Sequence, residues 1–90
     1  MNIDRELVIT QLRAYRHCLA HDRIVESDVR LVAYADGSYD MQLGDVSFDT
    51  VHGIACGAST LNVGDTNTEI DALADDLISQ VEDQIAESES

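Results

Sequence analysis

The apolar residues of this chain change their spacing twice, and this change restricts its fold more than any other feature. Over residues 4–22 and 67–87 they recur every three or four positions, which predicts amphipathic helices. Over residues 28–51 apolar and polar residues alternate instead, which predicts half-buried strands. The two helical stripes consist of Leu7, Val8, Leu12, Tyr15, Cys18 and Leu19, and of Ile70, Leu73, Ala74, Leu77, Ile78, Val81 and Ile85.

Short polar residues mark where both helices begin. Asn2 or Asp4 is suited to cap the first helix, because its side-chain oxygen can accept from the first free backbone N–H groups. Thr66 and Glu69 stand three residues apart before the second stripe, which is the spacing of a capping box. At the other end of the second helix, residues 87–90 are expected to fray.

The central segment contains a hairpin. Residues 29–35 have the composition of a strand, and Asp36-Gly37 is a strong two-residue turn signal. Two strand registers are compatible with this turn. A two-residue turn places Tyr34 opposite Tyr39, whereas a three-residue loop with a bulge shifts the pairing by one.

More strands are expected after this hairpin. A turn at Gly44 leads into residues 46–48, and residues 60–63 form a last strand. Glycines interrupt the short apolar segments in the rest of residues 52–66, which we predict to be ordered loop. The prediction is therefore one α+β domain over residues 1–90: an N-terminal helix, a three- to four-stranded antiparallel β-meander and a C-terminal acidic amphipathic helix. Both helices are expected to cover one face of the sheet.

The charge balance is far from neutral. Eighteen acidic residues stand against five arginines and no lysine, for a net charge of −13. Such a surface repels nucleic acid and anionic membranes and attracts basic partners, so neither direct nucleic-acid binding nor membrane binding is expected. The sequence shows no basic-then-apolar leader and no apolar run of about 20 residues, which predicts a cytoplasmic protein.

The negative charge is concentrated towards the C-terminus. Residues 1–23 sum to +1, residues 24–66 to −6 and residues 67–90 to −8. The acids of the last helix are expected opposite its apolar stripe, over about 30 Å, or roughly one charge per 4 Å. Phosphates of one DNA strand recur at about 3.4 Å. These acids are Glu69, Asp71, Asp75, Asp76, Glu82, Asp83, Glu87 and Glu89.

In its length, its acidic and lysine-free composition and its mixed α/β layout, the chain resembles small phage-encoded anti-CRISPR and other anti-defence proteins. The resemblance covers the whole chain and transfers no particular residue. Many such proteins mimic DNA, their carboxylates occupying a nucleic-acid channel on the defence complex. The resemblance thus implies an inhibitor that binds a nucleic-acid-binding complex, such as a CRISPR effector, in the host cytosol.

On this reading the protein is a binding module and not an enzyme, and its partner is a protein with a basic nucleic-acid-binding groove. The expected contact residues are Glu69, Asp71, Asp75, Asp76, Glu82, Asp83, Asp45 and Asp49. A homodimer through the apolar parts of the sheet is left open. The alternative is a small structural or halophile-adapted protein whose acids only solvate it.

Histidine and cysteine spacings raise the question of a metal site. Four potential zinc ligands occur in pairs four residues apart: His17, His21, His52 and Cys56. The stretch around His52 does not have a helical pattern, and Cys-x-x-Cys signatures are absent, so no metal or cofactor is expected. Cys18 and Cys56 are expected to be reduced thiols, with a disulfide between them as the alternative.

Two other groups of residues have side chains found in catalytic or calcium sites but lack the other features of such sites. Cys56, His52 and Asp49 have the residue types of a nucleophile, a base and an orienting acid, but a chain of this size has little room for a substrate pocket. Residues 36–40 contain two aspartates, yet they lack the alternating ligands and the terminal glutamate of a calcium loop. We therefore predict no catalytic residues.

Overall fold

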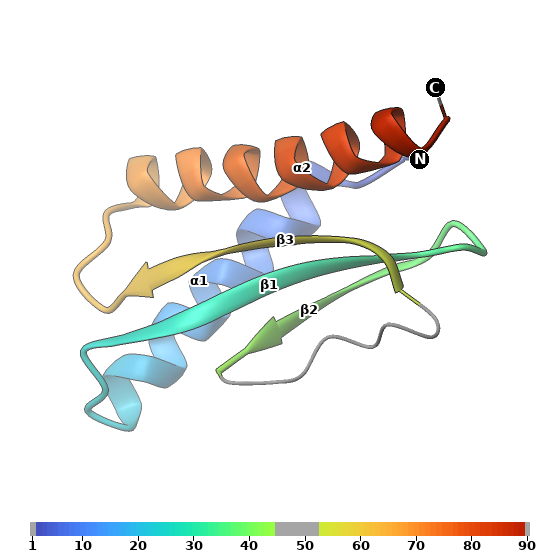
Figure 1. The fold of residues 1–90 in the computed structure, drawn as a ribbon. Coiled ribbons are helices and arrows are strands. Elements are labelled where there is room, and N and C mark those ends of the chain that lie inside the picture. Colours follow the sequence, from blue (N-terminus) through green and yellow to red (C-terminus); the bar gives the residue numbers. More distant parts are fainter. Residues whose placement is uncertain (1, 45–52, 90) are drawn as a thin grey trace.

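The computed structural model describes residues 2–44 and 53–89 and shows two helices and a three-stranded antiparallel sheet (Figure 1). The elements are α1 (Arg5–His21), β1 (Glu26–Tyr34), β2 (Tyr39–Leu43), β3 (Gly53–Asn62) and α2 (Asn67–Glu89). This order confirms the predicted α+β layout of helix, sheet and helix. The strand expected at residues 46–48 lies outside the described residues.

The sheet has the strand order β2-β1-β3, so the first strand lies in its centre. β3 follows β2 in the chain but pairs antiparallel with β1, from Glu26 opposite Asn62 to Tyr34 opposite Gly53. A simple meander would instead have placed β2 in the middle. One edge of the sheet is therefore β2 and the other is β3, the strand next to α2.

The hairpin between β1 and β2 has a three-residue loop. Tyr34 N–H donates to the carbonyl oxygen of Ser38 (2.9 Å), and Ala33 lies opposite Tyr39. Gly37 adopts φ +91°, a left-handed conformation that closes such a loop with a bulge. Of the two registers considered, the structure therefore has the one shifted by one residue.

β3 begins earlier than predicted. The sequence predicts a strand only at residues 60–63, because Gly53 and Gly57 suggest a loop; the structure instead forms a strand from Gly53 to Asn62. At Gly57 an added Cβ atom would lie 2.6 Å from the carbonyl oxygen of Leu77 in α2. This glycine therefore serves close packing of helix on strand, and it does not interrupt the strand.

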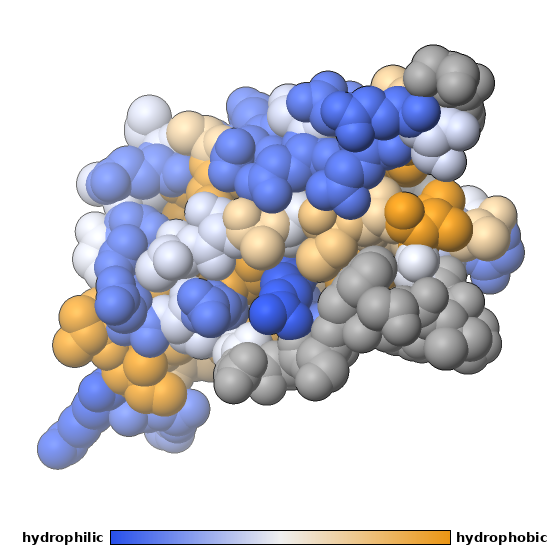
Figure 2. Space-filling model, in the orientation of Figure 1, coloured by the Kyte–Doolittle hydropathy of each residue, from blue (hydrophilic) through white to orange (hydrophobic). Residues whose placement is uncertain are grey.

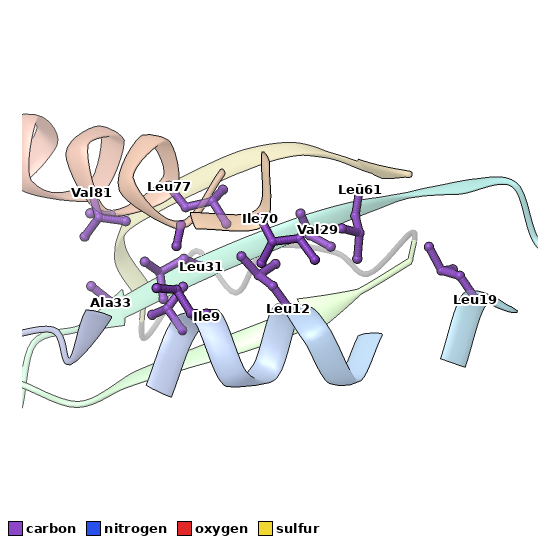
Figure 3. Close-up of a cluster of buried hydrophobic side chains, with 13 residues drawn as sticks. Ile9, Leu12, Leu19, Val29, Leu31, Ala33, Leu61, Ile70, Leu77 and Val81 are labelled. Carbon is purple, nitrogen blue, oxygen red and sulfur yellow. The ribbon is translucent and has the colours of Figure 1, made fainter. Parts of the chain in front are cut away.

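The core lies between the two helices and one face of the sheet (Figure 3). It includes alternate residues of β1, one stripe of each helix and part of β3: Val8, Ile9, Leu12, Leu19, Val29, Leu31, Ala33, Ala55, Leu61, Ile70, Ala74, Leu77 and Val81. Both helices thus cover the same face, as predicted. All of these side chains are at least 95% buried.

The buried stripe of α1 differs from the predicted one. Leu7 is 59% exposed and Cys18 is exposed, whereas Ile9, absent from the predicted stripe, is buried. The reason is that α1 packs on α2 as well as on the sheet. Its buried stripe is therefore rotated towards α2, the side from which Arg5 and Arg13 reach α2, one turn on either side of Ile9.

The predicted helix caps are confirmed. The Asp4 carboxylate accepts from the backbone N–H groups of Glu6 and Leu7 (3.0 and 3.4 Å). At α2, the Thr66 hydroxyl accepts from Glu69 N–H (3.2 Å) while the Glu69 carboxylate accepts from Thr66 N–H (3.1 Å). These bonds lower the pKa of Glu69, and they show that this side chain caps the start of the helix. The other end of α2 continues to Glu89.

Candidate partner-binding surface

The acids of α2 do not form a single face. Asp71 and Asp75 lie on the side of α2 that meets α1, and there they meet arginines. Arg5 donates to both carboxylate oxygens of Asp75, at 2.6 and 3.3 Å, and Arg13 lies 3.7 Å from Asp71. Helix α2 carries no basic residue of its own, but arginines of the neighbouring α1 lie beside these two acids. The net charge of each sequence segment does not reveal that α1 lies beside α2 in the fold.

A third arginine of α1 holds the start of α2. Arg16 donates to the backbone carbonyl of Asp65 (2.8 Å) and to the Asn67 side-chain oxygen (2.9 Å). Together with Arg5 and Arg13 it forms a row of cations along α1 that is directed at α2. Each of these three arginines thus contacts α2 or the residues just before it.

The Arg5–Asp75 contact is expected to make the stability of the fold depend on pH. The hydrogen bond and charge of Arg5 lower the pKa of Asp75. A carboxyl group with a depressed folded-state pKa stabilises the fold above its unfolded pKa, and this contribution is lost as pH falls through the folded value. In an NMR titration Asp75 is expected to protonate below the ordinary range, and Arg5→Gln should return its pKa towards that range. An unchanged Asp75 titration in the variant would contradict the assignment.

On the opposite side of α2, two glutamines bind the edge of the sheet. Gln80 accepts from the N–H of Ala58 and donates to its carbonyl, both at 3.0 Å. Gln84 does the same at Cys56, at 2.9 and 2.7 Å. Four residues of helix rise about 6.0 Å and two residues of strand about 6.8 Å, so the two spacings match. The side-chain amides thus occupy positions that a neighbouring strand would otherwise fill.

Removing these amides should expose the edge. In a Gln80→Ala/Gln84→Ala variant the backbone N–H groups of Cys56 and Ala58 lose their acceptors. We expect faster hydrogen exchange at these two amides and a loss of about 1–3 kcal/mol in the free energy of unfolding. Ser79→Ala, on the exposed side of the same helix, is the control and should change neither quantity. Equal exchange rates in both variants would show that the amides contribute nothing.

The acids of α2 that follow Asp75 have different surroundings. Residues 76–89 carry five acids and no base. Within the described part of the chain no arginine pairs with Asp76, Glu82 or Asp83, and all three are exposed. Asp76 also accepts a hydrogen bond from Gln80 (3.0 Å). Figure 2 shows the exposed side of α2, along the top of the view, as a band of hydrophilic side chains.

The predicted contact residues therefore separate into groups with different surroundings. Asp71 and Asp75 face arginines, Glu69 caps the helix, and Asp76, Glu82 and Asp83 face solvent as predicted. Asp45 and Asp49 lie outside the described residues. We define Asp76, Glu82 and Asp83 as the outer acids. The end of α2 that follows them lies at the same end of the molecule as the N-terminus and the β1–β2 hairpin (Figure 1).

The described residues give little support to the chemical alternatives. No three His, Cys, Asp or Glu side chains gather there as metal ligands, and His52 and Asp49 are outside this part. Both cysteines are free thiols, so the alternative disulfide is not formed. Burial raises the pKa of Cys56, which makes its thiolate less available as a nucleophile.

The turn at Asp36 is stabilised by its own residues. The Asp36 carboxylate accepts from the N–H and the hydroxyl of Ser38 (2.9 and 2.6 Å), and these bonds lower its pKa. This pattern is that of an Asx turn, in which the carboxylate closes the loop. The segment is thus the hairpin turn that the sequence predicts.

Comparison with protein-family models, with curated protein sequences and with solved structures gives no match. Among the described helices, none is both long and apolar enough to cross a membrane.

Proposed function

We propose that the protein inhibits a nucleic-acid-binding complex, such as a CRISPR effector, by placing the outer acids and the end of α2 in a basic groove of that complex. Binding would rely on carboxylates paired with arginine and lysine of the target, and electrostatic steering would speed association. The observation that carries the proposal is the separation of charge along α2: arginines of α1 lie beside Asp71 and Asp75, whereas within the described residues none pairs with the outer acids.

The acids at the end of this helix oppose its macrodipole. The macrodipole is negative at a helix C-terminus, where basic residues stabilise and acidic ones cost about 0.3–1 kcal/mol each at low ionic strength. The last turn of α2 holds Glu87 and Glu89 and no basic residue. Acids in an electrostatically unfavourable place support a role outside the fold.

The same separation argues against a purely solvating role. An acidic surface that only keeps a chain solvated requires net charge and no particular arrangement of that charge. Here one helix carries four of the five arginines on or just after it, and the other helix carries none. The charges are thus sorted between two neighbouring helices, which favours a directed acidic surface over general solvation.

Competition by nucleic acid tests this proposal. The protein is immobilised and incubated with a bacterial lysate, and the retained proteins are then challenged with short double-stranded DNA or RNA. We expect at least one retained nucleic-acid-binding complex, whose release depends on nucleic-acid concentration. The purified complex should in turn lose its nucleic acid when this protein is added. Retention that saturating nucleic acid leaves unchanged would overturn the mimicry proposal.

A further inference from the structure

A groove of about 420 Å³ lies between α1 and β2, on the other side of α1 from α2. Its lining is largely apolar and aromatic: Leu7, Val8, Thr10, Gln11, Tyr15, Tyr39, Asp40 and Met41. Leu7 is 59% exposed there, although leucine is normally buried. Together with Tyr15, Tyr39 and Met41 it gives the groove a shared apolar lining, and a patch of this kind is surface that a partner can cover.

Among the described residues, the one charged side chain that lines this groove is negative. Asp40 lies near the phenol of Tyr15, whose pKa is raised by burial and by this carboxylate. The arginines of α1 are directed elsewhere, since Arg5 and Arg13 reach α2. The combination of two tyrosines and one carboxylate fits a cation: aromatic faces attract guanidinium and ammonium groups, and the carboxylate pairs with them.

The groove is held in place by bonds within the protein. The Tyr39 hydroxyl accepts from Asp4 N–H (3.3 Å), which ties the ring to the start of α1. The Asp40 carboxylate accepts from Met41 N–H (2.9 Å), which fixes its position on β2. Both groups are thus positioned before any ligand arrives, and this reduces the cost of ordering them on binding.

We infer that this groove binds an arginine side chain, flanked by an aliphatic residue, on the basic partner protein. The guanidinium lies against Tyr15 and Tyr39 and pairs with Asp40, and the aliphatic neighbour covers Leu7 and Met41. A second copy of this chain is a poor occupant because both copies carry a charge of −13. This inference rests on the proposed function for the identity of the partner, and it adds a second contact away from α2.

Peptide titration tests the groove by itself. The probe is the acetylated, amidated peptide Gly-Leu-Arg-Leu-Gly, and its control carries citrulline, a neutral isostere, in place of arginine. In ¹H–¹⁵N spectra we expect the arginine peptide to shift Leu7, Gln11 and Met41, and the citrulline peptide to bind at least about fivefold more weakly. Shifts confined to the acids of α2 would overturn the groove assignment and leave the proposed function standing.

Two variants that each lose one negative charge distinguish binding in the groove from general electrostatic attraction. Asp40→Asn removes the carboxylate but keeps an oxygen that can accept from Met41 N–H, and it should weaken the arginine peptide at least about fivefold. Asp28→Asn removes one exposed charge from β1, outside the groove lining, and should leave the affinity unchanged. Equal losses in both variants would show that only net charge matters. Peptide binding in the groove combined with failed nucleic-acid competition would refute the proposed function alone.

Discussion

The double variant Asp76→Asn/Asp83→Asn is expected to bind the partner complex roughly 5- to 1,000-fold more weakly than the unaltered protein. The range corresponds to about 0.5–2 kcal/mol for each of two carboxylates that pair with cations in a desolvated groove. The fold should be retained or slightly stabilised, because both side chains are exposed and the chain is already strongly acidic. Affinity is measured at two salt concentrations and stability by thermal unfolding.

The matched control is Asp71→Asn/Asp75→Asn. It removes the same two charges from the same helix, but at positions that face arginines of α1. Bulk attraction between the protein and a basic partner falls equally in both variants. We therefore expect the control to keep most of the affinity. If both variants lose it equally, net charge and not the outer acids governs binding.

Gly57→Ala is expected to be the most destabilising of the alanine substitutions at Gly37, Gly44, Gly57 and Gly64. The new Cβ atom would lie 2.6 Å from the carbonyl oxygen of Leu77 and 3.3 Å from the Cβ atom of Gln80. The closer contact is backbone, so no side-chain rotation relieves it and α2 must move away from β3. We expect a cost of about 1–3 kcal/mol. In a domain of this size this corresponds to a melting temperature roughly 5–20 °C lower.

Gly64→Ala is the control for this experiment. An added Cβ atom at Gly64 meets nothing within 4 Å, and its φ angle lies outside the left-handed region. The change should be neutral or slightly stabilising, because alanine restricts the unfolded chain. A Gly57 variant that melts like the Gly64 variant would show that helix and strand are not in close contact at this position.

The sequence was sufficient for the elements whose signals are local. The capping box of Thr66 and Glu69, the cap at Asp4 and the apolar stripe of α2 are all present as predicted. Start and stop signals act within a few residues, so they can be recognised without knowledge of the surroundings. The hairpin was recognised for the same reason, although its register depends on the conformation of Gly37.

The parts that were missed depend on contacts between distant segments. Glycine at position 57 suggests a loop when taken alone, and only the nearby helix explains it. The pairing of Asp71 and Asp75 with α1 likewise requires knowing which helix faces align. Gln80 and Gln84 gave a weak signal, two amides four residues apart beside an apolar stripe, but the strand edge that they bind was predicted as loop.

The amides of Gln80 and Gln84 also cover one edge of the sheet without any basic residue. Exposed strand edges invite pairing with other chains, and proteins commonly discourage this with lysine. A lysine on β3 would add a positive charge beside the acids of α2. Neutral amides from a helix cover this edge without any cation, so protection of the edge and a strongly negative surface are compatible here. A lysine-free chain can in this way protect a β-sheet edge and keep its negative charge available.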